Sequence, residues 1–515
     1  MKFNLNNFIL RTDSYKLTHW LQYPKGMKKL YSYLEARGGE FEKTLFCLLQ
    51  YYIKEYFIDV KITHQDIDEA EYFADLHFGT PGKFNRKGWE YIVDVLEGKL
   101  PLEIKAVKEG TLVPTHNILM SIESTDENCI WLVNVAETIL MKLWYPITIS
   151  TNSFYRKLDI AKALKESNNE DLSNLLWKLH DFGYRGTTSE EQAGIGGVAH
   201  LINFLGTDTV RGILFANNYY DSGVCGFSVP ASEHSVACSY GKDHEDEYFL
   251  NMITQYPTGL VSIVSDTYHT FNFVRNMSTK YKELILKREG TIVFRPDSGN
   301  PVDINAGVGF EENGKYYKYV EIPQIPGEEK VEITRDEHLG LIGILWEIFG
   351  GETDKNGYKK LPSQIRLIQG DGIDKIMVKK IGDALIEKKF STDNIVYGSG
   401  GGLLQKFDRD TCKFAIKASY GIQEVDGQDI ILNLVKDPFT SKGKKSKAGK
   451  LKLVEFDIEN KPYTELHTVS SLEKAFDLYN DELEIVYKNG VLYRDQKFDE
   501  VREIANKYFE KELNS

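Results

Sequence analysis

The chain has 515 residues and a formal net charge of −13, with 42% hydrophobic, 12% aromatic and 27% charged residues. These values are typical of folded globular proteins, and they exclude a disordered chain, a collagen-like repeat and a small disulfide scaffold. The acidic balance argues against a protein that binds nucleic acid through its phosphate backbone, although a local basic patch could bind a small polyanion. The length suffices for two or three domains.

The cysteines and the apolar segments predict a cytoplasmic protein without a membrane segment. The N-terminal residues lack the apolar core of a signal peptide. The most apolar run, 130–145, is interrupted by Glu137 and Lys142, and we expect it to end at Pro146. The five cysteines are far apart and form no C-x-x-C pair, which favours a reducing compartment. They are Cys47, Cys129, Cys225, Cys238 and Cys412.

The hydrophobic pattern divides the chain into two kinds of sequence. Residues 1–150 mix strand-like runs with amphipathic helices, and from 151 to 404 short apolar strands alternate with helical segments. That alternation is typical of parallel strands joined by crossover helices, as in an α/β barrel or a doubly wound sheet. A Gly-, Glu- and Lys-rich stretch near 302–338 is interpreted as an insertion. Residues 405–515 return to strand-like segments, and we expect them to pack with 1–150 as one mainly β or α+β domain.

Five predicted strands end in an acidic residue or in glycine. They are followed by Asp208, Asp266, Asp297, Asp371 and the loop 398–402. In α/β folds the loops after the carboxyl ends of parallel strands form the active site. A single aspartate after a strand is common in turns and helix caps, but five such strand ends in order favour one shared site.

The loop 398–402, Gly-Ser-Gly-Gly-Gly, is a candidate phosphate cradle. It follows a predicted strand and precedes an apolar helix start, so its backbone N–H groups can approach an anion without interference from a Cβ. It does not match the G-x-x-x-x-G-K-[ST] pattern, and a structural tight turn is the alternative.

Cations follow this loop in an otherwise acidic chain. Arg409, Lys417 and the lysine-rich stretch 436–452 could close over a polyphosphate, or the stretch could be a solvated loop or a nucleic-acid tail. Carboxylates such as Asp266 and Asp297 could hold Mg²⁺, and Asp371 could bind sugar hydroxyls. A phosphorylated sugar bound with magnesium is therefore the expected ligand.

Two further motifs carry candidate chemistry. Glu233 and His234 stand side by side at a predicted helix start, where the histidine could accept a phosphoryl group or move a proton, or could be structural. The segment HDFGYRGTTSEE places the Phe182 ring near the Arg185 guanidinium, a pair that suits a flat heteroaromatic substrate but also suits a core ring and a surface ion pair. We expect Thr188 to cap the following helix.

A resemblance becomes specific when the motifs are taken together. The segments TDSYKLTHW, KLHDFGYRG, SVPASEHS, FRPDSGNP, IQGDG and GSGGGLLQK, in this order, resemble the nicotinamide phosphoribosyltransferase family, within the nicotinate and nicotinamide phosphoribosyltransferase superfamily. The resemblance implies a homodimer in which an irregular α/β barrel adjoins a mainly β domain made from both chain ends, with active sites across the dimer interface. It also implies transfer of the 5-phosphoribosyl group from phosphoribosyl pyrophosphate to nicotinamide, in NAD salvage.

The resemblance assigns roles residue by residue. It implies that Phe182, Arg185, Asp208, Ser262 and the partner subunit's Tyr15 contact nicotinamide. It implies that the phosphoribosyl group and the phosphates are bound by Arg37, Arg295, Asp297, Gly370, Asp371, Gly400, Gly401, Arg409, Lys417 and Lys444. His234, with Glu233 beside it, matches a histidine phosphorylated by ATP in a facultative step. Mg²⁺ is expected at Asp266 and Asp297, through water, and the residues expected to act in catalysis are Glu233, His234, Asp266, Arg295 and Asp297.

Three other functions stay open at this point. Nicotinate phosphoribosyltransferase has the same reaction class, but Asp208 at the ring would repel the carboxylate of nicotinate. A barrel aldolase or isomerase needs a Schiff-base lysine or a base at a strand end, and the strand ends carry acids but no such lysine. A non-catalytic nucleotide-binding or signalling protein would have little need of intact Asp208, His234 and Asp297.

Overall fold

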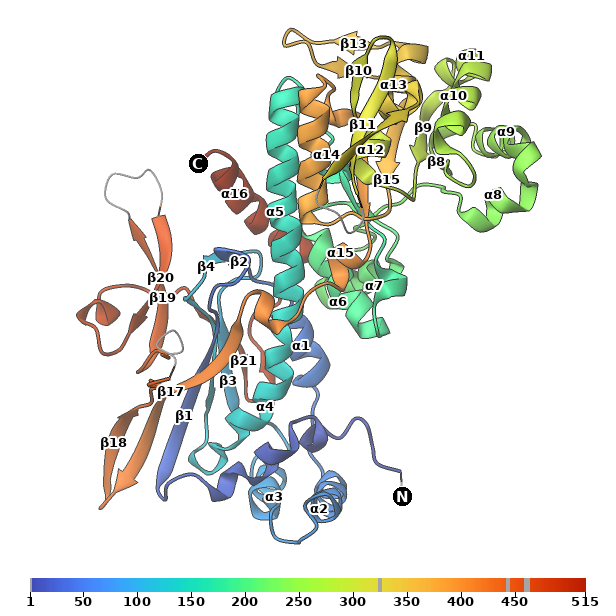
Figure 1. Cartoon of the computed structure of the whole chain (residues 1–515). Coiled ribbons are helices and arrows are strands. Elements are labelled where there is room, and N and C mark those ends of the chain that lie inside the picture. Colours follow the sequence, from blue (N-terminus) through green and yellow to red (C-terminus); the bar gives the residue numbers. More distant parts are fainter. Residues whose placement is uncertain (1, 323–326, 441–444, 458–463) are drawn as a thin grey trace. The chain divides into compact units, whose positions relative to one another are not determined.

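The computed structural model describes residues 2–322, 327–440, 445–457 and 464–515 (Figure 1). The chain forms two compact units, each assembled from segments that are far apart in sequence. Unit 1 comprises Met1–Thr151, Ala216–Ser222 and Phe407–Tyr508, and unit 2 comprises Asn152–Phe215, Gly223–Lys406 and Phe509–Ser515.

Unit 1 is built on a seven-stranded antiparallel sheet with the order β18-β17-β1-β5-β3-β21-β22. Strand β1 pairs with β17 on one side and with β5 on the other, so a C-terminal strand lies against an N-terminal one. This pairing confirms a mainly β region made from both chain ends. The strands are β1 (Met27–Ala36), β3 (Leu102–Ala106), β5 (Ile118–Ser124), β17 (Phe414–Val425), β18 (Gln428–Asn433), β21 (Glu484–Lys488) and β22 (Val491–Leu492).

Helices and two small antiparallel pairs complete unit 1. Apolar side chains at helical spacing, such as Ile67, Ala70 and Ala74 of α2, are buried. The helices are α1 (Leu49–Tyr56), α2 (His64–Phe78), α3 (Arg86–Asp94) and α4 (Leu132–Leu140). The pairs are β2 (Lys43–Leu45) with β4 (Leu112–Pro114), and β19 (Leu451–Asp457) with β20 (Thr464–Ser470).

Unit 2 is built on a six-stranded parallel sheet with the order β7-β6-β16-β15-β9-β8. Because the strands are parallel, their carboxyl ends share one edge, and the five strand ends singled out in the sequence meet there. The strands are β6 (Leu179–Asp181), β7 (Gly206–Thr207), β8 (Thr258–Val264), β9 (Glu289–Arg295), β15 (Ile365–Gln369) and β16 (Ile395–Ser399).

The extended segment 227–232 joins the two edges of this sheet. At the β7 edge, Thr207 N donates to Phe227 O at 2.9 Å, and at the β8 edge, Ser262 N donates to Pro230 O at 2.9 Å. Backbone hydrogen bonds therefore continue from one edge strand to the other. The curled sheet and this segment form the irregular α/β barrel that the sequence predicts.

Helices follow the strands of unit 2, as expected of crossover connections. They are α6 (Glu190–Leu201), α7 (Val210–Tyr220), α8 (His234–Tyr240), α9 (Glu245–Gln255), α10 (Thr270–Lys280), α11 (Lys282–Leu286), α12 (Pro301–Ala306), α13 (Arg335–Phe349), α14 (Lys375–Glu387) and α15 (Gly401–Leu404). Helices α5 (Trp144–Ser167) and α16 (Phe498–Leu513), like α7, each contribute residues to both units. Within the described ranges, no helix is long and apolar enough to span a membrane.

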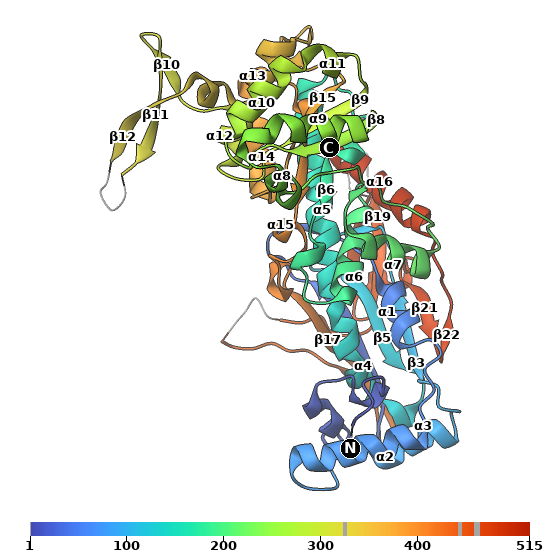
Figure 2. The ribbon, with the colours of Figure 1, turned by 90° about the vertical axis from the view of Figure 1, so that its right-hand side faces the viewer.

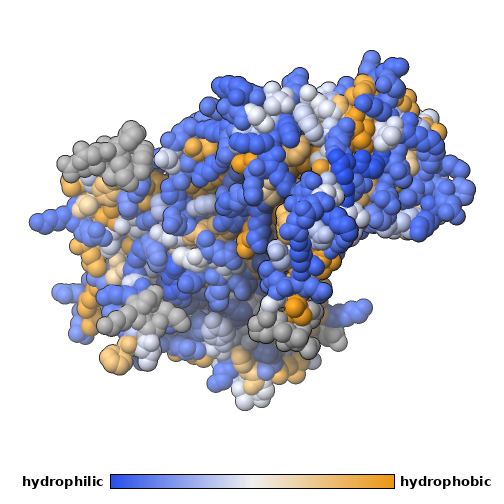
Figure 3. Space-filling view, turned by 45° about the horizontal axis from the view of Figure 1, so that its top comes forward, coloured by the Kyte–Doolittle hydropathy of each residue, from blue (hydrophilic) through white to orange (hydrophobic). Residues whose placement is uncertain are grey.

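The predicted insertion forms a three-stranded antiparallel arm between α12 and α13. Its strands are β10 (Phe310–Glu312), β11 (Lys315–Glu321) and β12 (Glu328–Ile333). Figure 2 shows β11 and β12 extending away from the sheet of unit 2. A short pair, β13 (Glu352–Thr353) with β14 (Lys359–Lys360), follows α13. On the face seen in Figure 3, hydrophobic residues occur in small groups among hydrophilic ones.

Two local expectations are wrong. Pro146 does not end a helix but lies in the first turn of α5, where the N–H that proline lacks would have no intrahelical partner. Helix α6 is capped by Ser189, whose hydroxyl accepts a backbone hydrogen bond of 3.1 Å, rather than by Thr188. Both residues are good caps, and in the structure it is Ser189 that has the extended backbone of an N-cap.

Candidate active site

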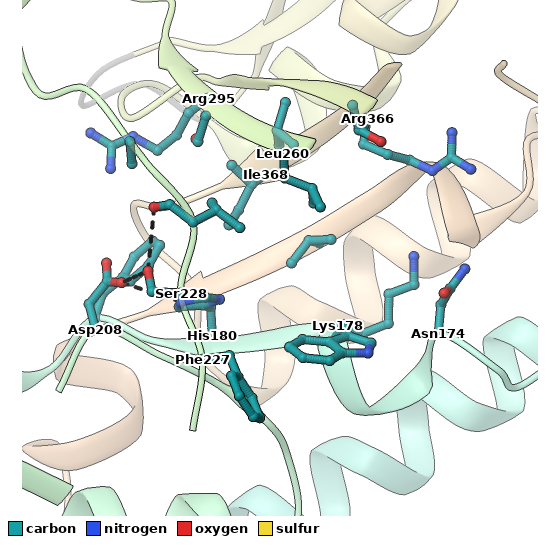
Figure 4. A pocket seen from close by; sticks show the side chains of 18 of the residues that line it. Asn174, Lys178, His180, Asp208, Phe227, Ser228, Leu260, Arg295, Arg366 and Ile368 are labelled. Carbon is teal, nitrogen blue, oxygen red and sulfur yellow. Dashed lines mark hydrogen bonds and ion pairs between the residues drawn. The ribbon is translucent and has the colours of Figure 1, made fainter. Parts of the chain in front are cut away.

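A cavity of about 570 Å³ lies inside the barrel of unit 2. Phe182, Asp208 and Arg295 line it near the carboxyl ends of the strands, and Lys178 and Arg366 line it near their amino ends. Figure 4 shows Asp208, Ser228 and His180 on one side of the cavity and Lys178, Asn174 and Arg366 on the other. The wall between these polar groups is apolar, and its side chains include Trp177, Phe227, Val229, Leu260, Val293, Ile368 and Val396.

The Asp208 carboxylate is held in place by two partners at the cavity wall. The Ser228 hydroxyl donates to Asp208 Oδ1, and His180 Nε2 lies 3.4 Å from the same oxygen. Burial alone would raise the pKa of Asp208, but His180, Ser228 and Arg295 outweigh burial and lower it. The carboxylate is therefore ionised at neutral pH and can accept hydrogen bonds from a ligand.

The Phe182 ring is fixed by the backbone around it. Phe182 N donates to Ser399 O at 3.0 Å, which ties the loop after β6 to the end of β16. A Cβ on Gly398 would lie 2.0 Å from Phe182 Cε2, so the ring occupies space that only a glycine leaves free. The preceding residue, Asp181, is buried and accepts from Gly183 N at 2.7 Å. A flat ring of fixed position in the cavity wall suits stacking against an aromatic substrate.

Asp297, Gly370 and Arg295 lie close together beside Phe182. A Cβ on Gly370 would lie 2.5 Å from Asp297 Oδ1, 3.6 Å from Phe182 Cε2 and 3.7 Å from Arg295 Cδ. Arg295 Nη2 donates to Ser232 O at 3.0 Å, so the closing segment of the barrel orients this guanidinium. The neighbouring Asp371 is exposed. This corner presents a carboxylate, a cation and accessible backbone to a ligand.

His234 and Asp266 form an ion pair or hydrogen bond, with 3.1 Å between His234 Nε2 and Asp266 Oδ1. The Asp266 side chain is 4% exposed and that of His234 is 43% exposed, so the carboxylate orients an accessible imidazole. Glu233 precedes helix α8, as expected, and its carboxylate accepts from Ser235 Oγ.

The structure offers a partial donor set for a metal ion. Asp266 and Asp297 follow the paired residues Val264 and Arg295 at the ends of neighbouring strands β8 and β9. No group of three His, Cys, Asp or Glu side chains with metal-ligand spacing occurs in the described parts of the chain. Mg²⁺ commonly binds one or two carboxylates together with substrate phosphates, so these two aspartates fit such an ion.

A second cavity, of about 480 Å³, lies in unit 1 and collects the predicted cations of that unit. Tyr15, Arg37, Arg409 and Lys417 all line it. Burial, together with Arg37 and Arg409 nearby, lowers the pKa of Lys417, although Glu137 opposes this effect. The cavity also contains Lys16, Lys142, Asp13, Glu137 and Asp410.

The remaining predicted residues differ in where the structure places them. Ser262 is buried and lines the barrel cavity, whereas Arg185 is exposed and is not among its lining residues. A Cβ on Gly400 would lie 3.4 Å from Phe182 O, which places Gly400 and the adjoining Gly401 beside the Phe182 loop. Lys444 lies outside the described residues.

Sequence reasoning missed several residues of the barrel cavity. His180 lies within the quoted Phe182 motif, and its position at the end of a strand was a usable signal. Ser228 and Phe227 lie on the closing segment, which has no strand-like alternation and gave no such signal. Lys178 and Arg366 lie at the amino ends of strands, on the side opposite the predicted site.

Comparisons with known proteins agree with this arrangement. The model of the nicotinate phosphoribosyltransferase (NAPRTase) family matches residues 177–480, and that of the nicotinamide phosphoribosyltransferase N-terminal domain matches residues 7–104. The chain is 40% identical over 505 residues to nicotinamide phosphoribosyltransferase of Xanthomonas campestris pv. campestris, with 98% of each chain covered. It is 33% identical over 528 residues to nicotinamide phosphoribosyltransferase of Acinetobacter baylyi, covering 98% of this chain and 97% of that protein.

The fold comparison agrees with the architecture of the chain. The crystal structure of nicotinate-nucleotide pyrophosphorylase from Pyrococcus furiosus superimposes with a TM-score of 0.55 at 15% identity, covering 100% of this chain and 98% of that chain. The barrel, the carboxyl-edge acids and these matches define a phosphoribosyltransferase. The chain belongs to the nicotinate phosphoribosyltransferase (NAPRTase) family.

Proposed function

We propose that the protein transfers the 5-phosphoribosyl group from phosphoribosyl pyrophosphate to nicotinamide, giving nicotinamide mononucleotide and pyrophosphate in NAD salvage. Two relatives named nicotinamide phosphoribosyltransferase match nearly the whole chain and support this proposal. The observation that carries the choice of nicotinamide is the ionised Asp208 carboxylate in the barrel cavity, beside the Phe182 ring.

Recognition of the pyridine follows from these two groups. The ring of nicotinamide stacks on Phe182, and its amide NH₂ donates to Asp208, whose other contacts with Ser228 and His180 keep the carboxylate in place. Ser262 is buried in the same wall and offers a hydroxyl to the amide. A charged acceptor forms stronger hydrogen bonds than a neutral one, so the amide is bound with a fixed orientation.

The phosphoribosyl group occupies the corner formed by Asp297, Gly370 and Arg295. Asp297 and Asp371 accept from the ribose hydroxyls, and the backbone of Gly400 and Gly401 receives the 5′-phosphate. Asp266 and Asp297 would hold Mg²⁺, through water. When bound, the ion neutralises charge on the departing pyrophosphate.

The reaction needs no protein nucleophile. The C1′–oxygen bond to pyrophosphate breaks while the pyridine nitrogen forms a bond to C1′, and the electron pair leaves with pyrophosphate. Positive charge develops on the ribose, so catalysis consists of holding the nitrogen at C1′ and stabilising the leaving group. The fixed Phe182 ring performs the first task, and Arg295 contributes to the second.

We further propose that the enzyme is a cytoplasmic homodimer. In this arrangement the partner subunit's Tyr15 covers the second face of the pyridine, and the unit 1 cavity, with Arg37, Arg409 and Lys417, binds phosphate or pyrophosphate of the neighbouring active site. The excess of cations in that cavity supports this role. The five cysteines are reduced and four of them are buried, which supports a reducing compartment.

ATP is proposed as a facultative co-substrate. His234 is accessible and is oriented by Asp266, which suits a histidine that accepts a phosphoryl group. Mg²⁺, already proposed at Asp266 and Asp297, would accompany the nucleotide phosphates.

Nicotinate is the second candidate substrate. The family model that matches residues 177–480 is named for nicotinate, and Arg295 in the cavity could pair with a carboxylate. The ionised Asp208 opposes this candidate, because two carboxylates would then share one pocket.

The test is a product assay with purified full-length protein, phosphoribosyl pyrophosphate and Mg²⁺, with nicotinamide and nicotinate in separate reactions, each with and without ATP. Nicotinamide mononucleotide as the main product supports the proposal. Product from nicotinate alone would retain the reaction class and overturn the amide assignment, and no product from either base would reject the enzyme activity. Any ATP stimulation is then measured on His234→Ala, which should lose the stimulation.

A further inference from the structure

Arg156 is a fully buried guanidinium beneath the glycine loop 398–402. It lies in α5, and its side chain is 0% exposed. Its Nη1 donates to Ser399 Oγ at 2.9 Å, and its Nη2 donates to Gly402 O at 2.5 Å. Ser399 is the last residue of β16 and Gly402 lies in α15, so the two acceptors flank Gly400 and Gly401 (Figure 1). One buried side chain therefore holds both ends of the loop.

Among the described residues, Arg156 has no close carboxylate to balance its charge, whereas another buried cation of the same unit does. Lys178 is also buried, and its Nζ lies 2.8 Å from the buried carboxylate of Asp393. No carboxylate oxygen lies within 4.0 Å of Arg156 among the described residues, and its Nε has no hydrogen-bond partner there. Asp374 and Asp159 act on it only from a greater distance. A buried charge without a close counter-ion is costly, and such charges are usually paired.

The guanidinium nevertheless stays charged under physiological conditions. Burial lowers the pKa of Arg156 to about 10, which is still well above neutral pH. The loop above it therefore experiences a fixed positive charge from the protein interior. Bulk solvent screens this charge little, because the side chain is inaccessible.

The loop itself is tightly fitted around this contact. Ser399 Oγ, which accepts from Arg156, donates in turn to Ile373 O at 2.6 Å. A Cβ on Gly402 would lie 2.4 Å from Ile373 O, so the loop packs directly against the segment after β15. A change in the position of Arg156 would therefore move the loop backbone rather than a single side chain.

We infer that Arg156 is a positioning residue that fixes the glycine loop and supplies, from beneath it, the positive charge that favours a phosphate dianion on the loop. The inference rests on the proposed function, in which the ligand is the 5′-phosphate of the phosphoribosyl group. The phosphate then acts as the counter-ion that Arg156 lacks among the described residues. Loss of this charge should weaken phosphate binding selectively and should leave pyridine binding unchanged.

The test compares Arg156→Gln, which keeps hydrogen-bond donors but removes the charge, with Arg156→Lys, which keeps the charge. Arg156→Gln should raise the KM for phosphoribosyl pyrophosphate at least tenfold, with kcat within about threefold and the KM for nicotinamide unchanged. Arg156→Lys should restore the KM for phosphoribosyl pyrophosphate to within about threefold of wild type. A merely structural role would instead lower kcat and thermal stability in both variants without this selectivity, and that result would overturn the inference.

Lys157→Gln is the matched control. Lys157 is buried on the same helix, and its Nζ lies 4.3 Å from the centroid of the Phe509 ring rather than at the loop. Its loss removes a buried cation of similar depth, so it should lower the melting temperature without changing the KM for phosphoribosyl pyrophosphate. A similar rise in KM for Lys157→Gln would show that any buried cation of α5 has the same effect, and would overturn the specific role of Arg156.

Inorganic phosphate separates this inference from the proposed function. Calorimetric titration with phosphate should show wild-type binding and at least tenfold weaker binding by Arg156→Gln, whatever pyridine the enzyme uses. If wild type turns over neither base but this difference holds, the proposed function fails and the role of Arg156 stands. If Arg156→Gln does not fold, Arg156→Lys decides. Retained phosphate affinity in folded Arg156→Lys supports a role for the charge, and a more than tenfold loss of phosphate affinity contradicts it.

Discussion

Gly398 and Phe182 are in such close contact that the ring lies where a side chain at position 398 would begin, with 2.0 Å between an added Cβ and Phe182 Cε2. The glycine at the end of β16 thus determines the position of the aromatic ring at the end of β6. Because these strands are neighbours in the parallel sheet, the contact is made within the rigid frame of the barrel.

Gly398→Ala should therefore reduce activity by displacing the ring. A displacement of about 1 Å in a positioning group can lower the rate about 100-fold, so we expect kcat/KM for nicotinamide to fall by about that factor. The KM for nicotinamide should rise more than that for phosphoribosyl pyrophosphate. The control is Gly382→Ala in α14, where an added Cβ would lie 3.7 Å from Ala163 Cβ, an ordinary contact. Equal kinetics for the two variants would contradict this prediction.

Asp208→Asn should weaken the preference for nicotinamide. The substitution retains the size of the side chain but replaces the charged acceptor, and a hydrogen bond to a charged group contributes about 1.5–3 kcal/mol. We expect kcat/KM for nicotinamide to fall about 10- to 100-fold, with a smaller fall for nicotinate. Steady-state kinetics with both bases measure the ratio. Ser228→Ala leaves the carboxylate in place and should have a smaller effect, and an unchanged ratio in Asp208→Asn would rule out Asp208 as the amide acceptor.

Asp181→Asn should change how stability depends on pH. Burial raises the pKa of Asp181 to about 6, although the hydrogen bond from Gly183 N opposes the shift. A carboxyl group whose pKa is higher in the folded state stabilises the fold at low pH, and this contribution is lost as pH rises through about 6. Relative to wild type, Asp181→Asn should therefore gain up to about 2–3 kcal/mol in the free energy of unfolding between pH 4 and pH 7. Urea unfolding at both pH values measures the gain, and parallel profiles would show that Asp181 titrates normally.

Asp393→Asn should destabilise unit 2. The buried Asp393 carboxylate has Lys178 Nζ at 2.8 Å, Lys360 Nζ at 3.0 Å and Arg366 Nη2 at 3.3 Å, so its neutralisation leaves three cations without their counter-ion. Loss of one partner from a buried ion pair costs about 3–5 kcal/mol in the free energy of unfolding. Chemical denaturation at neutral pH measures this loss.

The pH dependence of the Asp393 effect has the opposite sign to that of Asp181. The three cations outweigh burial and hold the pKa of Asp393 well below its usual range, so its stabilisation is present at neutral pH and is lost in acid. The difference between wild type and Asp393→Asn should narrow as pH falls below about 4. Asp383→Asn is the control, because Asp383 pairs with Lys379 on the surface of α14 and its loss should cost about 0.5 kcal/mol at most. A similar loss in both variants would contradict the prediction.

The edge of the barrel could be predicted from the sequence because each strand carries its own signal. An apolar run followed by an acid or a glycine is local, and parallel strands bring such ends together whatever the order of the strands. Asp208 and Asp297 were therefore identifiable without knowledge of the sheet order. Their roles rest on the resemblance and stay predictions.

Other features depend on contacts that no local pattern encodes. Arg156 lies in the polar-looking stretch FYRKLD, and an arginine in a helix normally faces solvent, so its burial follows only from the packing of α5 against the glycine loop. Ser228 belongs to a segment without alternation, whose extended form is imposed by hydrogen bonds to two strand edges. The cap of α6 shows the limit of local reasoning, because two adjacent residues were equally suitable.

The segment 227–232 closes the barrel between β7 and β8 and also forms one side of the substrate pocket. Smaller side chains at Phe227 or Val229 would enlarge the pocket, but they would also loosen the packing of the backbone segment that joins β7 to β8. Changes in substrate range obtained there should come with changes in melting temperature. Ile368 on the opposite wall belongs to β15, which is held by a neighbouring strand on each side. Substitutions at Ile368 should therefore change the substrate range with a smaller change in melting temperature.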